Sequence, residues 1–295
     1  MSMKIYDCII IGAGPGGLQA AIYLGRYNRE VLLLDRGGGR TWHARQIENF
    51  ITQKAISGKE IIDIGMKQAQ SFNVRIKKAE VTRVLKRDYF EVSTGDEKFI
   101  SKFIIVSSGV YEKLPKLENL HKFFGTSFFT CVDCDGYNTT GKKLAVIGNS
   151  IEAVHLAFAV REMFTNDVAL VLEGYRVPPG YETELKDEEI TLIIGRPTKI
   201  IGDENMVAVE LEGGRKIECE VILASYGYRL NDDFLSDIEL KKDREGFYFA
   251  NQNFESSLQG LYIVGPLNTG NDQVVISAGE GAAAAIDINK RLLNI

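Results

Sequence analysis

The stretch YDCIIIGAGPGG, residues 6–17, decides the fold. It begins with a short apolar run, which is typical of a parallel strand buried on both faces. Gly12, Gly14 and Gly17 follow with the spacing G-x-G-x-x-G, and residues 18–27 continue with helical periodicity. At these three positions glycine permits a tight turn, the approach of a pyrophosphate to the backbone, and close packing of the helix on the strand.

An acidic residue completes this pattern. Residues 31–34 read as a second strand that ends in Asp35, about 20 residues beyond the turn, where a carboxylate can bind a ribose hydroxyl. A lone glycine motif is weak evidence, but here strand, glycines, helix, strand and acidic residue occur in order. The sequence therefore predicts a dinucleotide site, and GGGRTWH (37–43) and IENF (47–50) stand where a long ligand would extend.

A second stretch, TCVDCDG at residues 130–136, carries a pair of cysteines. Cys131 and Cys134 can close a small disulfide ring and reopen it as a dithiol, although the same spacing can be half of a zinc site. The other cysteines, Cys8 and Cys219, stand alone inside apolar runs, and the three histidines are scattered along the chain. A redox pair is therefore favoured over an inert pair or a metal site, and we expect no metal.

Length and composition limit the function classes. The chain has 295 residues, enough for two domains, and it is 45% hydrophobic and 25% charged, as globular proteins are. No apolar run reaches the roughly 18–20 residues that span a bilayer, and the first residues show no signal-peptide pattern. We therefore expect a cytoplasmic protein without a membrane segment, in which a lone C-x-x-C is more typical of catalysis than of structure. The net charge of −5 argues against a nucleic-acid partner.

The ordered motifs resemble the low-molecular-weight thioredoxin reductases. Besides the glycine turn, IENF and the cysteine pair, the resemblance rests on SSG at residues 107–109 and on Gln273 followed by AGEGA at residues 278–282. It covers nearly the whole chain. It implies an α/β fold with two Rossmann-like (three-layer ββα) nucleotide-binding lobes, the second of which is inserted into the FAD domain.

The resemblance also implies the domain boundaries and the cofactor. We expect a discontinuous FAD-binding domain at residues 1–113 and 245–295, and an inserted redox-disulfide domain at residues 116–243. The expected FAD-binding residues are Gly12, Gly14, Pro15, Gly16, Gly17, Asp35, Arg36, Gly39, Arg40, Asn49, Ser108, Gly109, Gly265, Gln273 and Val274. Pro266 and Asp272 depart from the family, which has an aspartate and an arginine at these places.

The C-terminal helix is predicted over residues 271–293. Its N-terminus should face the flavin ring, and Ala278, Gly279, Ala282 and Ala283 form a small-residue face fit for close packing. The single tryptophan, Trp42, either packs in the core or stacks on the flavin or on a partner.

Roles for the redox residues follow from the same resemblance. Cys134 is expected to face the flavin, Cys131 to attack the disulfide of a thioredoxin-like partner, and Asp135 to serve as the acid/base carboxylate. Asp133, between the cysteines, departs from the family, and its negative charge should raise the pKa of a neighbouring thiol. Members of the family are homodimers, which we also expect here.

The second lobe lacks the features that bind NADPH in this family. Residues 143–147 read as a strand, but in the following turn only Gly148 remains glycine, and Ser150 crowds the approach of a pyrophosphate. Glu173 begins EGYR where the family has a His-Arg-Arg cluster, and PPG at residues 178–180 breaks the expected helix.

We therefore predict that the second lobe has a degenerate NADPH-binding fold and binds no pyridine nucleotide. This resembles the branch of the family that takes electrons from ferredoxin. Two alternatives remain: an NAD(P)H-dependent thioredoxin reductase with an atypical nucleotide site that uses Glu173, and a flavin redox sensor or assembly partner without turnover.

Overall fold

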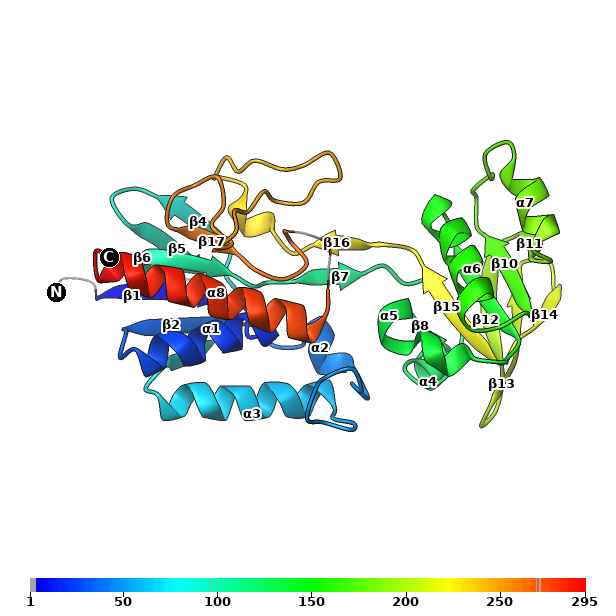
Figure 1. The fold of residues 1–295 in the computed structure, drawn as a ribbon, viewed down its shortest axis with the longest axis horizontal. Coiled ribbons are helices and arrows are strands. Elements are labelled where there is room, and N and C mark those ends of the chain that lie inside the picture. Colours follow the sequence, from blue (N-terminus) through cyan, green and yellow to red (C-terminus); the bar gives the residue numbers. More distant parts are fainter. Residues whose placement is uncertain (1–3, 96, 269, 271) are drawn as a thin grey trace. The chain divides into compact units, whose positions relative to one another are not determined.

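The structure, a computed structural model, describes residues 4–95, 97–268, 270 and 272–295. The chain folds into two compact units, whose elements are labelled in Figure 1. Unit 1 contains the described residues up to Tyr111 together with Arg229–Ile295, and unit 2 contains Glu112–Tyr228. Unit 2 therefore interrupts unit 1, and each unit holds a sheet of mostly or wholly parallel strands with helices. The predicted α/β fold with an inserted second Rossmann-like lobe is confirmed.

Unit 1 is built on a seven-stranded sheet in the order β3-β2-β1-β6-β5-β4, with β17 paired to β6. Its parallel strands are β1 (Ile5–Ile11), β2 (Val31–Asp35), β3 (Arg75–Lys78), β6 (Glu97–Val106) and β17 (Leu261–Ile263). The antiparallel strands are β4 (Arg83–Lys86) and β5 (Phe90–Thr94). β1 is buried almost throughout, because neighbours flank it on both sides and helices cover its face, which accounts for its apolar sequence.

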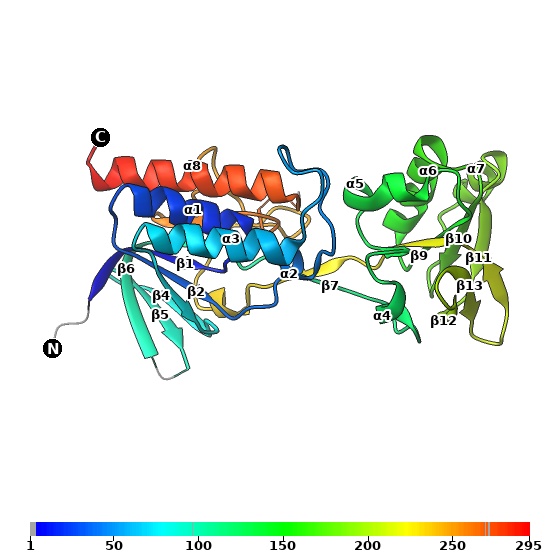
Figure 2. The same cartoon turned by 90° about the horizontal axis from the view of Figure 1, so that it is seen from below.

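Three long helices lie side by side along unit 1: α1 (Pro15–Arg26), α3 (Gly58–Ser71) and α8 (Val274–Leu292) (Figures 1 and 2). A short helix, α2 (Arg40–His43), precedes α3, and a 3-10 turn, η2 (Asp233–Leu235), follows the return of the chain from unit 2. Contact between α1 and α8 is backbone-close, since a Cβ on Gly281 would lie 2.0 Å from the carbonyl oxygen of Gly16.

The prediction that Ala278, Gly279, Ala282 and Ala283 form the closely packed face of the C-terminal helix is wrong. Gly279 is exposed, with nothing within 4 Å of the place of a Cβ, and the buried face of α8 instead contains Ser277, Gly281, Ala284 and Ala285. These positions share one side of a helix with 3.6 residues per turn, and the predicted set is rotated away from it. The helix begins at Val274, later than predicted, and the predicted first residue, Asn271, lies outside the described residues.

Unit 2 has a five-stranded parallel sheet in the order β11-β10-β9-β15-β8. Its strands are β8 (Phe128–Phe129), β9 (Leu144–Gly148), β10 (Val168–Leu172), β11 (Thr191–Ile194) and β15 (Val221–Ser225). The helical elements are α4 (Leu120–Phe123), α5 (Val132–Asp135), η1 (Gly136–Thr139), α6 (Ile151–Met163) and α7 (Tyr181–Asp187). An antiparallel sheet contains β12 (Pro197–Gly202), β13 (Met206–Leu211) and β14 (Lys216–Glu218).

Two hydrophobic cores fill unit 2, one shared by the parallel and antiparallel sheets and one between the parallel sheet and its helices. Helices, parallel sheet and antiparallel sheet are therefore three layers. Two consecutive strands of this unit, β14 and β15, belong to different sheets. The break falls at Cys219 and Glu220, where the chain crosses between the two layers.

The chain leaves unit 1 through β7 (Val110–Glu112) and returns through β16 (Tyr228–Leu230), and these two strands pair with each other. Unit 1 resumes at Arg229, before the expected residue 245, because Phe234 and Leu235 are buried in its core. In the parts of the chain that the structure describes, no helix has the length and apolar character needed to cross a membrane.

Candidate dinucleotide cavity and redox disulfide

Unit 1 contains a cavity of about 530 Å³ at the carboxyl ends of β1, β2 and β6. It lies where the starts of α1 and α8 meet the sheet, which is the usual ligand position in open parallel sheets. Thirteen of the predicted cofactor residues line it: Gly12, Gly14, Pro15, Gly16, Asp35, Arg36, Gly39, Arg40, Ser108, Gly109, Gly265, Gln273 and Val274. Gly17 and Asn49 are not among the lining residues.

The three glycines of the first turn have different structural roles. Gly12 has φ +101°, and a Cβ there would lie 2.3 Å from the carbonyl oxygen of Ser107. A Cβ on Gly17 would lie 2.0 Å from the oxygen of Gly12, so Gly17 serves helix–strand packing. Gly14 is open, because its nearest contact would be the Ser107 oxygen at 3.8 Å. The space next to Gly14 is thus left to a ligand, beside the first N–H groups of α1, where no side chain provides a cap.

Asp35 is held in place by the turns around it. One carboxylate oxygen accepts a hydrogen bond from the Ala13 N–H at 2.9 Å, and the other accepts from the Gly37 N–H at 2.8 Å. A carboxylate has about four acceptor positions, so both oxygens retain capacity for ligand hydroxyls. The residue lines the cavity, as a ribose-binding carboxylate must.

Part of the cavity wall comes from segments that the sequence did not single out. The Ser108 hydroxyl donates to the carbonyl of Asn231 at 2.6 Å, and the Asn231 side-chain amide donates to the Ser108 carbonyl at 3.0 Å. Asn231 and Phe234 line the cavity from the returning segment, and Val81 lines it from the segment after β3. The signal for Val81 was its position after a parallel strand, whereas nothing in the sequence indicated Asn231.

A buried carboxylate supports another part of the wall. Glu280, only 5% exposed, accepts hydrogen bonds from the N–H of Gly265 and, at 3.1 Å, from the side-chain amide of Asn268. Burial raises the pKa of Glu280, although both hydrogen bonds oppose this effect. The carboxylate ties helix α8 to the turn at Gly265 and Pro266, which line the cavity. Sequence reasoning missed this role of Glu280.

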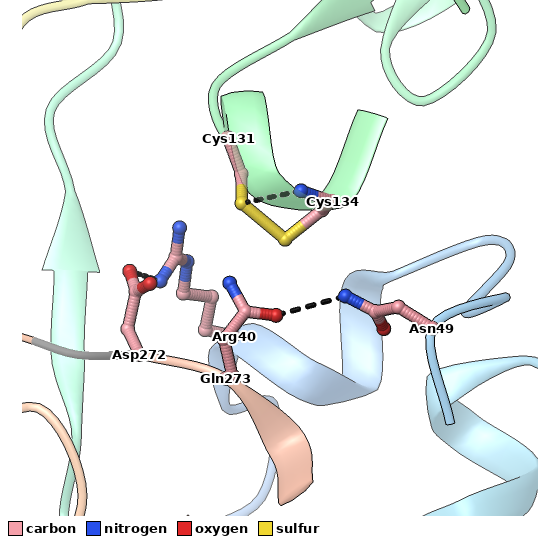
Figure 3. Close-up of a disulfide and its surroundings, with 6 residues drawn as sticks. All are labelled: Arg40, Asn49, Cys131, Cys134, Asp272 and Gln273. Atoms are coloured by element: carbon pink, nitrogen blue, oxygen red, sulfur yellow. Dashed lines mark hydrogen bonds and ion pairs between the residues drawn. A yellow bond between two sulfur atoms is a disulfide. The ribbon is translucent and has the colours of Figure 1, made fainter. Parts of the chain in front are cut away.

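Two side-chain pairs join the segment after β2 to the start of α8 (Figure 3). Arg40 forms an ion pair with Asp272, and the Asn49 amide donates to the Gln273 side-chain oxygen at 2.9 Å. Trp42 lines the cavity, and the Lys59 ammonium lies 4.9 Å from the centre of the Trp42 ring system.

The redox pair belongs to unit 2. Cys131 and Cys134 form a disulfide on the turn that follows β8, and the Cys134 N–H donates to the sulfur of Cys131 at 3.1 Å (Figure 3). Asp135 is the last residue of the same short helix, α5, and its N–H donates to the Cys131 carbonyl. The turn is packed tightly behind, since a Cβ on Gly136 would lie 2.7 Å from the Phe164 ring. Within the described residues, no group of three His, Cys, Asp or Glu is placed to hold a metal ion.

The glycine turn of unit 2 follows β9 and differs from that of unit 1. A Cβ on Gly148 would lie 2.5 Å from the Ala153 Cβ and 2.6 Å from the Ser225 carbonyl oxygen, so this glycine is required by packing. Glu152 stands in the first turn of α6, and its pKa is lowered by a hydrogen bond with Ser150 and by its own backbone N–H. A carboxylate therefore stands at the helix start where a pyrophosphate would bind.

Glu173, after β10, is also engaged. The Tyr226 hydroxyl donates to its carboxylate at 3.1 Å, and burial together with this negative charge raises the pKa of Tyr226. Arg176 is exposed. The helix that PPG was predicted to break does form, but as a seven-residue helix that begins after Gly180. The hydroxyl of its first residue, Tyr181, forms a hydrogen bond with Nε2 of His155 at 3.1 Å, which gives His155 a structural partner.

Comparison with known proteins agrees with this architecture. The profile of the family described as "Pyridine nucleotide-disulphide oxidoreductase" matches residues 6–281. The chain is 30% identical to a thioredoxin reductase of Aquifex aeolicus, over 98% of this chain and 94% of that protein. It is 25% identical to the Bacillus subtilis thioredoxin reductase, over 96% and 93%.

Among solved structures, the fold matches thioredoxin reductase from Streptococcus pyogenes with a TM-score of 0.91, at 23% identity and with both chains fully covered. The profile match over most of the chain and the Aquifex aeolicus relative show the family, and the solved structure shows the fold. This chain belongs to the pyridine nucleotide-disulphide oxidoreductase family and is a flavin oxidoreductase with thioredoxin reductases among its homologues.

Proposed function

We propose that this protein is an FAD-dependent disulfide oxidoreductase that takes electrons from a non-nicotinamide donor, with ferredoxin as the expected donor. The electrons pass through the flavin to the Cys131–Cys134 disulfide, and from there to thioredoxin or a similar protein disulfide. The observation that carries the proposal is the Glu152 carboxylate at the start of α6, where a nicotinamide nucleotide would need room for its pyrophosphate.

The unit 1 cavity fits FAD. The open space at Gly14 and the uncapped N–H groups at the start of α1 suit a pyrophosphate, and Asp35 suits a ribose. The start of α8 adds a second positive dipole end beside the cavity. When bound, FAD would accept single electrons from two ferredoxin encounters and pass them as a pair to the disulfide.

The second unit argues against a nicotinamide donor. A phosphate placed at the start of α6 would meet the Glu152 carboxylate and the Ser150 side chain instead of bare backbone. After β10, Glu173 would repel a 2′-phosphate, and its bond to Tyr226 holds it there. Repulsion of like charges at a binding site is a recognised way to reject a ligand.

The chemistry of the disulfide follows from the pair itself. Reduction by two electrons and two protons yields two thiols at Cys131 and Cys134. We propose that the Cys131 thiolate attacks the partner disulfide, forming a mixed disulfide and releasing one partner thiolate. Cys134 then attacks Cys131, which releases the second partner thiolate and restores the disulfide. Asp135 is the proposed proton carrier for these steps.

We further propose that the protein is cytoplasmic, since a reducing compartment suits a catalytic C-x-x-C. We also propose that it forms a homodimer, as the resemblance to the family implies. Light scattering coupled to gel filtration measures the mass directly. A mass equal to one chain of 32.8 kDa would contradict the dimer.

An anaerobic titration tests the donor. The flavin absorbance band should be bleached by chemically reduced ferredoxin within seconds and should persist with NADPH or NADH in tenfold excess. The control is Cys131→Ser/Cys134→Ser, which should bleach with the same donor but take up half as many electrons and reduce no thioredoxin. Rapid bleaching by either nucleotide would overturn the proposed donor. Bleaching by ferredoxin without thioredoxin reduction would instead indicate a sensor.

A further inference from the structure

We infer that Arg40 and Asp272 form a charged clasp that closes the dinucleotide cavity of unit 1 over its ligand and slows the ligand's release. The clasp is the Arg40–Asp272 ion pair, accompanied by the neutral hydrogen bond between Asn49 and Gln273. The inference rests on the proposed function for the identity of the ligand, FAD. These residues are positioning residues, because the structure shows them bound to one another.

The first support is position. Arg40 belongs to the segment 35–42, which lines the cavity without interruption, and Asp272 belongs to the cavity-lining start of α8. These segments are 232 residues apart along the chain at the ion pair, so the pair joins two separate walls of one cavity. Figure 3 shows the two contacts, both of which link residues after β2 to residues 272 and 273.

Burial gives the second support. The Arg40 and Asp272 side chains are 28% and 19% exposed, whereas those of the surface pair Arg83 and Asp237 are 53% and 40% exposed. Charges shielded from water attract each other more strongly than exposed ones, which contribute little. The Arg40–Asp272 pair is therefore a stronger link than an ordinary surface ion pair.

Local charge gives the third support. Asp272 immediately precedes Gln273, the N-cap of α8, and a carboxylate is favoured near the positive end of a helix. Asp272 was noted as a departure from the family, and its place in this chain is explained by the guanidinium of Arg40. A ligand enclosed by these walls should leave faster once the link between them is broken, because the two walls are then no longer joined at Arg40 and Asp272.

The experiment measures the rate at which FAD leaves the holoprotein, from the rise in flavin fluorescence after dilution. Arg40→Gln and Asp272→Asn should each speed release roughly tenfold. The double variant should be no faster than either single variant, because both remove the same interaction. The charge swap Arg40→Asp/Asp272→Arg should return the rate to within about threefold of the original, and a direct contact between Arg40 and FAD would not survive this swap.

Controls separate the clasp from other effects. Arg83→Gln, which breaks the more exposed pair with Asp237, should leave the rate unchanged. Salt should speed release from the original protein but not from the double variant, because only the former has a charge pair to screen. Asn49→Ala should increase the release rate by a smaller factor than Arg40→Gln. This factor, taken relative to the original protein at the same salt concentration, should not depend on salt, because the hydrogen bond between Asn49 and Gln273 is neutral.

Three results would count against the inference. Additive effects of Arg40→Gln and Asp272→Asn would show that they do not act as a pair, and an unchanged rate in both would show that no clasp operates. If the swap protein fails to fold, the neutral double variant still decides between pair and separate action. Purified protein without FAD would overturn both the proposed function and the clasp, whereas FAD that leaves each variant at the original rate would overturn the clasp alone.

Discussion

Unit 1 and unit 2 each place a turn between a central parallel strand and a helix, and the two turns can be compared residue by residue. The first runs from Gly12 to Gly17, and the second runs from Gly148 to Ala153. Gly12 and Gly148 meet the same obstacle, since a Cβ on either would touch the carbonyl of a serine at the end of a neighbouring strand. The first glycine is therefore required by the fold in both units.

The later positions separate the two turns. Gly14 and Gly16 of the first turn correspond in order to Ser150 and Glu152 of the second. In unit 1 the space at Gly14 is open to a cavity, and in unit 2 a carboxylate stands at the helix start. The comparison teaches that the fold needs the first glycine in both units, whereas a bound pyrophosphate also needs the open position that Gly14 provides in unit 1.

The largest expected effect comes from adding a methyl group to the first glycine of each turn. Gly12→Ala should yield protein with less than about a tenth of the normal flavin, because a side chain is strained by about 1–3 kcal/mol at such a φ and a Cβ would collide with Ser107. Gly148→Ala should lower the thermal stability of unit 2 but leave the flavin content intact. The flavin-to-protein absorbance ratio after gel filtration measures the difference. Equal flavin loss in both variants would contradict the division of roles between the units.

The second effect is a gain of function. Ser150→Gly/Glu152→Gly should tighten NADPH binding at least about tenfold, since one repulsive charge near a phosphate is worth on the order of 1.4 kcal/mol or more. Calorimetric titration of the oxidised protein measures the affinity. The matched control is Glu182→Gln, which removes an acidic residue from the first turn of α7 and should change nothing. If Glu182→Gln tightens NADPH binding equally, the net charge of the protein and not the turn after β9 is responsible.

The fold was largely predictable because its determinants are local. The apolar run of β1, the three glycines and Asp35 each mark one element in order, and the structure has those elements. The small-residue face of α8 was misjudged, because glycine and alanine occur all round that helix and only tertiary contact selects the side that Gly281 occupies. The composition of a helix therefore does not predict which of its sides is buried.

The site was predictable where a motif names it and not where distant segments meet. Glu152 could have been found, since it stands where the first turn has Gly16 and precedes an alanine at the place of Gly17. The Arg40–Asp272 pair could not, because 232 residues separate its members and neither charge predicts the other. Glu280 was visible in a motif, but its bond to Gly265 depends on the packing of α8.

A third prediction concerns the acidic residue in the redox turn of unit 2. Asp133→Thr should lower the pH midpoint of Cys131 alkylation in the reduced protein by about 0.3–1 unit, because a negative charge beside a thiol disfavours the thiolate. Iodoacetamide labelling across a pH series, read by mass spectrometry, measures the midpoint. The control Asp187→Asn removes an acidic residue of unit 2 outside this turn. An unchanged midpoint in Asp133→Thr would show that the turn tolerates the charge without cost to the thiolate.

The smallest expected effect is the pH dependence that Glu152 contributes. Its pKa in the folded protein lies below the ordinary value of 4.5, because the Ser150 hydroxyl and its own N–H stabilise the charged form. A group with a lowered folded pKa stabilises the fold above its unfolded pKa, and this stabilisation is lost as the pH falls through the folded value. Glu152→Gln should therefore lower the urea midpoint of unit 2 slightly at pH 7, and the difference should shrink towards pH 3.5. An equal difference in urea midpoint at pH 7 and at pH 3.5 would mean that Glu152 acts through packing and not through its charge. It would also contradict the electrostatic part of the contrast between the two turns.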